Sequence, residues 1–159
     1  FAFAFPALLS AIMLTAVYGP GLVTAIIAIG IFNVPVFARI TRAAASGVWS
    51  REYVLAARAC GKGAWSITWR HVLPNSMTPV ITFLPFRMSA AILALTSLDF
   101  LGLGVPPSIP SIGELLKQGK DNLDAWWIIV PTFLLLVITM LLLTFIGDAL
   151  RDAFDTRKS

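Results

Sequence analysis

Apolar positions in this chain gather into long runs, and charged positions, with the exception of Arg87, lie in the segments between or after them. The runs cover about residues 1–17, 22–37, 80–98 and 126–146, the second being the shortest and extended by alanines and polar residues toward Ala45. Because a helix rises about 1.5 Å per residue, roughly 20 apolar residues cross a hydrocarbon core of about 30 Å. The pattern therefore predicts an all-α integral membrane protein with four spans.

Composition agrees with this prediction. Hydrophobic residues make up 58% of the 159 residues and charged residues only 13%, against roughly 25% charged residues in soluble domains. The chain starts with Phe1 inside an apolar run, without a basic leader or a cleavage site, so we expect further spans to precede it rather than a signal peptide. The single cysteine, Cys60, excludes an internal disulfide.

The basic residues predict the orientation of the spans. Six of them lie between spans two and three and three follow span four, while Lys117 and Lys120 share the 99–124 loop with Glu114, Asp121 and Asp124. The positive-inside rule places the 39–78 loop and the C-terminus in the cytoplasm and the 99–124 loop outside. Since these basic residues flank spans, and no soluble face carries stacking aromatics, the net charge of +4 does not indicate nucleic-acid binding.

Short polar signals predict how the spans connect and pack. We expect an outer turn at Tyr18 to Gly21. Span two should let a neighbouring helix approach closely at its small residues Ala25, Ala28 and Gly30. Pro35 should bend this span. In the outer loop, Ser111 and Glu114 form a capping box for a short helix that ends near Gly119, and Trp126 with Trp127 anchor span four at the interface.

The cytoplasmic loop contains a basic, alanine-rich segment that predicts two short helices. From Glu52 to Cys60, the residues Leu55, Ala56, Ala59 and Cys60 fall on one small, mildly apolar face, with Arg58 pointing elsewhere. Gly61 and Gly63 break this helix, and 64–72 form a second one that Pro74 terminates before span three. Taken alone, such a loop is most often only a topology determinant; its small face also suits a groove in another protein.

The spacing of this loop resembles the signature of permease subunits in ATP-binding-cassette (ABC) importers: Glu-Ala-Ala, three residues, Gly, nine residues, Ile, one residue and Leu-Pro. Ala56, Ala57, Gly61 and the pair Leu73-Pro74 match at the required spacing. Leu55 stands at the Glu position and His71 at the Ile position, and Glu52, one turn earlier, is the candidate replacement for the missing carboxylate.

These departures resemble the dipeptide and oligopeptide branch of that family. The similar segments are Phe5-Pro6, Tyr18 to Gly21, Ala28 to Gly30, Ala38-Arg39, Glu52 to Gly61, Arg70 to Asn75, Phe100 to Val105 and Gly147 to Asp152. They cover essentially the whole chain. Within the branch, 84–89 with 98–100 look most similar to the second permease of the Yej type, which is associated with peptides and the antibiotic microcin C.

The resemblance implies a type I importer fold, of which 1–159 would be the C-terminal part, in the bacterial inner membrane. It implies a subunit that forms half of a peptide pathway with a second permease, two ABC ATPase domains that bind the ATP, and a periplasmic peptide-binding protein. In this chain the implied coupling loop comprises Glu52, Tyr53, Leu55, Ala56, Ala57, Arg58, Gly61, His71, Leu73 and Pro74. Ala56, Ala57 and Gly61 are expected to be small because the motor's groove tolerates little bulk.

Two charged residues in or beside span three are candidates for the translocation path. Arg87 lies near the middle of the span, where a charge requires water or a protein partner; the alternative is that it snorkels or pairs within the bundle. Asp99 could form an outer gate with Lys117 or Lys120, or cap loop backbone near Gly102.

The residues needed for nucleotide binding by a phosphate loop, or for catalysis, are missing from this sequence. A phosphate-binding loop at Gly61-Lys62 would need Gly at 56 and Ser or Thr at 63, where the chain has Ala56 and Gly63. His71 is the only histidine, and no nucleophile with a base, cofactor site or metal cluster is visible, so we predict that the chain is not an enzyme. A secondary transporter and an ABC permease for a non-peptide substrate such as nickel stay as alternatives.

Overall fold

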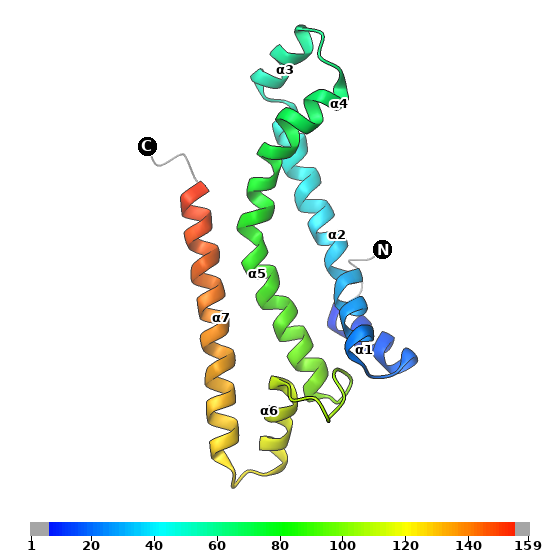
Figure 1. The fold of residues 1–159 in the computed structure, drawn as a ribbon, viewed down its shortest axis with the longest axis vertical. Helices are drawn as coiled ribbons and strands as arrows, with labels where there is room; N and C mark the ends of the chain where they lie inside the picture. The colour runs from blue at the N-terminus through cyan, green and yellow to red at the C-terminus, as the bar shows by residue number, and fades with distance from the viewer. Residues whose placement is uncertain (1–6, 155–159) are drawn as a thin grey trace.

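The computed structural model describes residues 7–154, and within this range the chain forms helices and no strand. The elements are α1 (Ala7–Tyr18), α2 (Leu22–Trp49), α3 (Glu52–Ala59), α4 (Ala64–Ile67), the π-helical turn η1 (Thr68–Val72), α5 (Leu73–Phe100), α6 (Ile112–Asp121) and α7 (Trp126–Phe154). Figure 1 shows α5 between the two other long helices, α2 and α7. The short helices α3 and α4 form one end of the molecule, and α6 lies at the other.

Three helices are long and apolar enough to cross a membrane: Leu22–Trp49, Ala64–Phe100 and Trp126–Phe154. They contain the second, third and fourth predicted spans. The first predicted span, 1–17, begins outside the described residues, and its described part is the shorter apolar helix Leu8–Tyr18. Four crossings therefore stay a prediction, while the multi-pass membrane character is established by the three long helices.

All three long helices are longer than the hydrocarbon core of a bilayer, and two of them lead to α3 and α4. At about 1.5 Å per residue, the 28 residues of Leu22–Trp49 are about 42 Å long and the 37 residues of Ala64–Phe100 about 55 Å. A hydrocarbon core is only about 30 Å thick. If their outer ends lie level with the membrane surface, both helices reach into the water on the side that carries α3 and α4.

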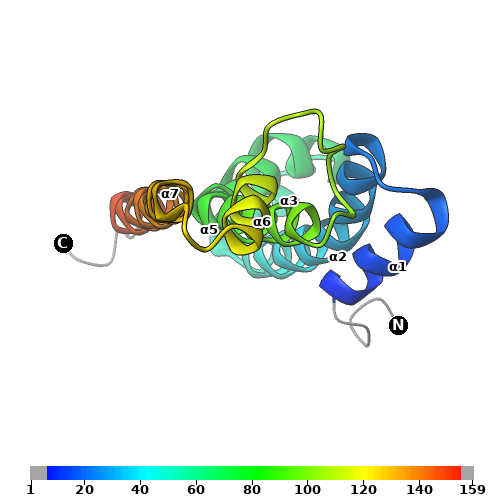
Figure 2. The same cartoon turned by 90° about the horizontal axis from the view of Figure 1, so that it is seen from below.

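The helices approach each other through small residues. Ala25 and Ala28 of α2 are fully buried and form a cluster with Ala11 of α1 and Leu98 of α5, which confirms the prediction for the two alanines. Gly30 differs from the prediction, because nothing lies within 4 Å of the position of an added Cβ. Figure 2, the view along the long helices, shows α1 beside α2 on the side of the molecule away from α7.

Pro74 does not end a helix, contrary to the prediction. The segment Ala64–Phe100 is one continuous helical run, and Pro74 lies in the first turn of α5. The reason is the π-helical turn immediately before it, in which the Leu73 N–H donates to the Thr68 carbonyl five residues earlier. This wider turn accommodates the Pro74 ring, which has no N–H to donate, without ending the helical run.

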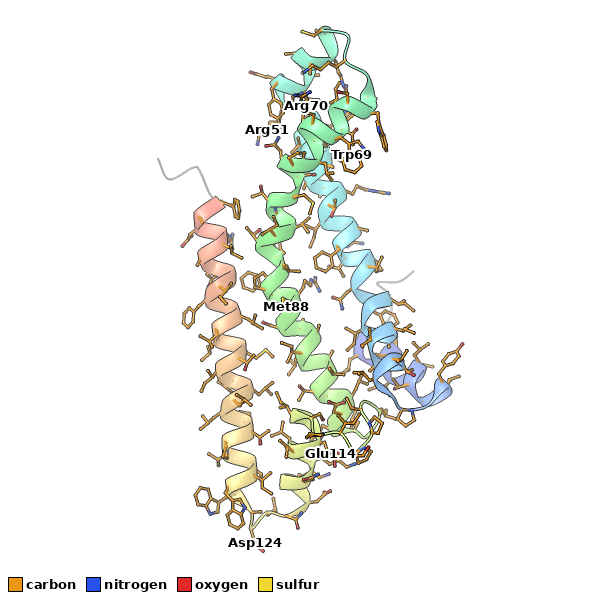
Figure 3. The ribbon with its side chains drawn as sticks, viewed as in Figure 1. Arg51, Trp69, Arg70, Met88, Glu114 and Asp124 are labelled. Atoms are coloured by element: carbon orange, nitrogen blue, oxygen red, sulfur yellow. The ribbon has the colours of Figure 1, made fainter. Side chains whose placement is uncertain are left out.

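The structure places the charged loops at opposite ends of the long helices. Figure 3 shows Arg51 and Arg70 at the end formed by α3 and α4, and Glu114 and Asp124 at the end formed by α6. The basic and acidic segments are thus separated by the full length of the apolar helices, as the positive-inside rule requires for a cytoplasmic α3–α4 end.

Labelling of single cysteines in a Cys60→Ser background tests this orientation. Ser66 and Ser108 are both exposed and lie in the two opposite loops. Ser66→Cys is expected to react with an impermeant maleimide only after the cytoplasmic side is opened, and Ser108→Cys in intact spheroplasts. The reverse pattern would contradict both the orientation and the functional assignment.

Candidate functional site

The loop between α2 and α5 folds into a compact structure, here called the tip, that comprises residues 50–72. Its core contains Val54 and Ala57 from α3, Ile67 from α4 and Val72 from η1, all buried. Ala45, Val48 and Trp49 at the end of α2 pack against this core. The tip is therefore fastened to the ends of both α2 and α5 by apolar contacts.

One face of α3 is left uncovered. Leu55, Ala56, Ala59 and Cys60 are all exposed, so the four residues predicted to share a face do share one, and it points away from the rest of the chain. Small side chains allow close approach of a second backbone. The face is thus flat, mildly apolar and available to another protein.

Ala57 does not belong to this face, contrary to the expectation. It is 8% exposed and packs in the core of the tip with Val54 and Ile67. Ala57 is therefore small because its own chain leaves little room above the α3 backbone. The periodicity could have indicated this, since Val54 and Ala57 are three residues apart and share the side of the helix opposite Leu55 and Ala59.

Gly61 ends α3 for a conformational reason. Its φ of +74° lies in the left-handed region, which glycine adopts without strain. The Gly61 N–H donates to the Arg58 carbonyl at 2.9 Å, and the Lys62 N–H donates to the Ala57 carbonyl at 3.2 Å, the two bonds of a Schellman motif. No described atom of this chain lies within 4 Å of an added Cβ, so within the chain it is backbone conformation that requires glycine here, and the expected fit in a partner's groove stays a prediction.

His71 connects three parts of the tip. Lys62 Nζ lies 3.5 Å from His71 Nε2, the Tyr53 and His71 ring centroids are 6.3 Å apart, and Asn75 Nδ2 donates to the His71 carbonyl at 2.7 Å. His71 thereby joins α3 and the Gly61 turn to the helical run that becomes α5. Its role in the described structure is one of packing and hydrogen bonding.

The remaining charged residues of the tip lie at its surface. Glu52 is exposed in the first turn of α3, where a carboxylate interacts favourably with the helix dipole. The Arg58 guanidinium lies 4.2 Å from the centroid of the Trp49 ring, a cation–π contact that orients it away from the open face. The predicted role of Glu52 as the substitute carboxylate for an ATPase contact stays a prediction.

Asp99, the first candidate for the path, binds loop backbone. It is 4% exposed, and its Oδ1 accepts the Val105 N–H at 2.8 Å. The loop begins with a second Schellman motif, since Gly102 has a φ of +76° and the Leu103 N–H donates to the Leu98 carbonyl at 2.8 Å. Lys120, a proposed partner, instead lies 3.6 Å from Asp121. This geometry supports the capping role; a place on the translocation path stays a prediction.

Two glycines that the sequence analysis did not single out make this arrangement possible. A Cβ on Gly104 would overlap the Asp99 carboxylate, and a Cβ on Gly113 of α6 would overlap the Asp99 Cβ and the Thr96 carbonyl. At the start of α6, the Ser111 half of the predicted capping box is present, because the Glu114 N–H donates to Ser111 Oγ at 3.1 Å, whereas Glu114 Oε1 accepts from Gln118 Nε2 at 3.2 Å. Thus α6 is packed directly onto the outer end of α5.

Arg87, the second candidate, faces a cavity between helices. It lies on α5 and is half-buried, and together with Asn33 of α2 it lines a cavity between α1, α2 and α5. Asn33 was not among the predicted residues, although an amide within an apolar run indicates a polar position inside the bundle. Whether the cavity belongs to a translocation path stays a prediction.

The described residues contain no group of His, Cys, Asp or Glu that could hold a metal ion. The features that distinguish this part of the chain are therefore a surface, the open face of α3, and a polar position inside the bundle, the pair Asn33 and Arg87.

The whole chain, residues 1–159, matches the family model described as the binding-protein-dependent transport system inner membrane component. It is similar to the peptidoglycan transport system permease protein YejE of Agrobacterium fabrum, 46% identical over 97% of this chain and 40% of the relative. It is also similar to the di/tripeptide transport system permease protein DppC of Pseudomonas aeruginosa, 40% identical over 97% of this chain and 51% of the relative.

A third relative is the inner membrane ABC transporter permease protein YejE of Escherichia coli, 53% identical over 68% of this chain and 32% of the relative. The chain thus spans about half or less of the length of these three curated relatives.

Replacing Gly104 by alanine tests the packing around Asp99. The added methyl group is expected to displace the carboxylate from the Val105 N–H and to destabilise the outer end by about 1–3 kcal/mol. The purified protein in detergent should then unfold several degrees lower. Gly47→Ala is the control, since nothing lies within 4 Å of an added Cβ there. Equal unfolding temperatures for the two variants would contradict the assigned role of Gly104.

Proposed function

Because this chain belongs to the family of binding-protein-dependent transport system inner membrane components, we propose that it is a permease subunit of an ATP-driven ABC importer for peptides. Two of the relatives are named for peptidoglycan or di/tripeptide transport, which supports a cargo containing peptide bonds. Membership of this family argues against a secondary transporter. The relatives named here give no support to a nickel permease.

The observation that carries the proposal is the open face of α3. Leu55, Ala56, Ala59 and Cys60 form an uncovered, small-residue surface on a helix at the end of the molecule opposite α6. We propose that this face docks in a groove of an ABC ATPase subunit. The other partners would be a second permease, a second ATPase domain and a periplasmic peptide-binding protein, and ATP would be bound and hydrolysed by the ATPases.

The connections of the tip suggest how force would be transmitted. α2 enters the tip at Trp49, and the helical run Ala64–Phe100 leaves it toward the outer side. Because the buried residues Val54 and Ile67 fix α3 to both helices, a displacement of α3 would move α2 and α5 together. ATP-driven closure of the motors would then switch the pathway between inward and outward access by rigid-body motion.

Cysteine cross-linking tests the docking surface. In a Cys60→Ser background, Ala56→Cys is expected to form a cross-link with the ATPase subunit, because its side chain lies on the open face. Ala57→Cys is the matched control on the same helix; its side chain points into the core of the tip and should give little product. Equal yields at the two positions, read from a denaturing gel, would contradict the proposed orientation of α3.

Replacing Gly61 by valine tests coupling. The positive φ strains a β-branched residue by about 1–2 kcal/mol, so the Schellman turn and the end of α3 should be displaced. Membrane insertion should be retained, whereas peptide uptake per ATP hydrolysed should fall severalfold in proteoliposomes.

Gly63→Val is the matched control, since Gly63 has a φ of −64° and free space around its Cα. It should leave the uptake ratio near the native value. Full coupling in Gly61→Val would count against the assignment of the tip.

A further inference from the structure

The cavity that contains Arg87 is small, partly open and lies between α1, α2 and α5. Its volume is about 140 Å³, and apart from Asn33 and Arg87 it is lined by apolar side chains of α1, α2 and α5. At the rise of a helix, Arg87 is about 20 Å from the outer end of α5 at Phe100, and Asn33 is about 17 Å from the start of α2 at Leu22. Both polar groups are therefore near the middle of the membrane.

The Arg87 guanidinium has no acceptor within hydrogen-bond distance among residues 7–154, whereas Asn33 Nδ2 donates to the Ile29 carbonyl at 2.8 Å. The cavity surrounding Arg87 has walls from three helices, which favours a position inside the bundle over one facing lipid. A charge at this depth is costly unless it meets water, a protein group or a ligand. The site thus combines a cation with a polar amide and calls for an anionic group.

We propose that Arg87 and Asn33 form a subsite that binds the C-terminal carboxylate of a peptide during transport. This inference rests on the proposed function. A guanidinium forms two parallel hydrogen bonds with a carboxylate, a geometry that other cations cannot reproduce. Since a water molecule occupies about 30 Å³ of liquid, the cavity of about 140 Å³ holds a carboxylate with a few waters, but not a whole peptide.

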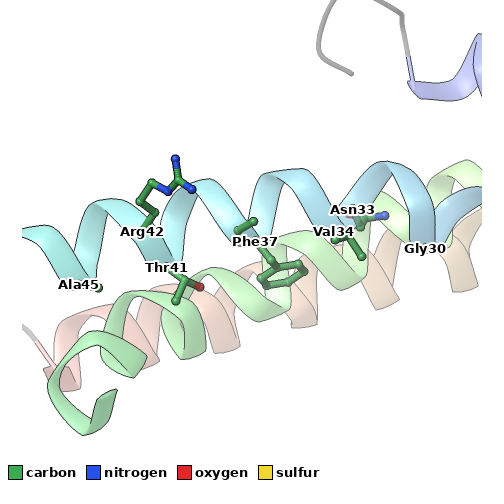
Figure 4. Close-up of a pocket in the computed structure, with 8 residues that line it drawn as sticks. Gly30, Asn33, Val34, Phe37, Thr41, Arg42 and Ala45 are labelled. Atoms are coloured by element: carbon green, nitrogen blue, oxygen red, sulfur yellow. The ribbon is translucent and has the colours of Figure 1, made fainter. Parts of the chain in front are cut away.

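The rest of the peptide has space along α2. A shallow, open groove of about 820 Å³, lined by α2 alone, follows one face of this helix, with Asn33 toward one end and Arg42 and Ala45 toward the other (Figure 4). Asn33 lines both this groove and the Arg87 cavity, so the two spaces adjoin. Between Asn33 and Arg42 the lining is uncharged, and Arg42 lies about 14 Å further toward the cytoplasm. A carboxylate that leaves Arg87 can therefore next interact with the guanidinium of Arg42.

The position of the subsite also connects it to the tip. Asn33 lies on α2 and Arg87 on α5, the two helices that the tip joins. A movement of α3 would carry α2 and α5, and with them Asn33 and Arg87, past α1, whose Leu8 and Ala11 complete the cavity, and would weaken their hold on the carboxylate. Release of the peptide would then accompany the motion driven by the ATPases.

Substrate charge provides the test. The full-length permease is reconstituted with its partner permease, ATPases and binding protein, and uptake of trialanine is compared with uptake of trialanine amide. Arg87→Gln should lower uptake efficiency for the free acid about tenfold or more, the loss expected for one charge-assisted hydrogen bond, with little change for the amide. Arg87→Lys should recover part of the loss, and Asn33→Leu should give a smaller loss in the same direction.

The ratio of acid to amide uptake is the measured quantity, because a preference of the binding protein affects all variants equally. Arg151→Gln removes an exposed arginine near the end of α7 and should keep the native ratio. An unchanged ratio in Arg87→Gln, with both peptides reduced equally or neither reduced, would overturn the carboxylate subsite while leaving the importer proposal intact. Failure of the native complex to import either peptide would overturn the proposed function and this inference with it.

Discussion

The buried contact of Val54 and Ala57 with Ile67 and Val72 is the interaction on which the functional part of this protein depends. An isolated helix as short as α3 is not stable in water. Here its inner face is covered by the ends of the helices that enter and leave the tip. The same contact fixes the outer face in one orientation, and it makes α3 move with α2 and α5 as one body. Docking and transmission thus rest on a few apolar side chains.

The outer end of the molecule is held by a different device, the close packing of backbone around Asp99. Gly104 and Gly113 let the loop and α6 approach the end of α5, and the Asp99 carboxylate binds the loop backbone at Val105. At Gly119, an added Cβ would overlap Ile129 of α7, so α6 is packed between α5 and α7. The outer ends of α5 and α7 are therefore fixed relative to each other. A motion that begins at the tip would leave this outer packing unchanged.

Between the two ends, the long helices leave most of their large apolar side chains uncovered, including Ile26, Phe133 and Leu141. In a membrane such side chains face lipid or other spans, and the hydrophobic effect does not drive helices together there. Contacts within the bundle instead use small residues such as Ala25 and Ala28. This leaves room for a half-buried arginine and an amide at the level where α1, α2 and α5 meet, and the proposed carboxylate subsite uses that room.

The sequence by itself predicted the three long membrane-length helices, an orientation from the placement of basic residues, the Ser111 cap and the open face of α3. Each of these depends on local periodicity, local charge or one backbone requirement. It also identified the family, because the spacing from Ala56 to Pro74 is a local pattern.

Tertiary structure decided what each residue contacts. Ala57 turned out to be a core residue of the tip, Gly61 to be required by its positive φ, and Pro74 to continue a helix through the π-helical turn before it. The pairing of Asn33 with Arg87 was likewise invisible in the sequence, since it depends on how α2 and α5 align over a separation of more than fifty residues. Local hydrogen bonding and periodicity can be read along a chain, whereas side-chain contacts between helices depend on their relative rotation and register.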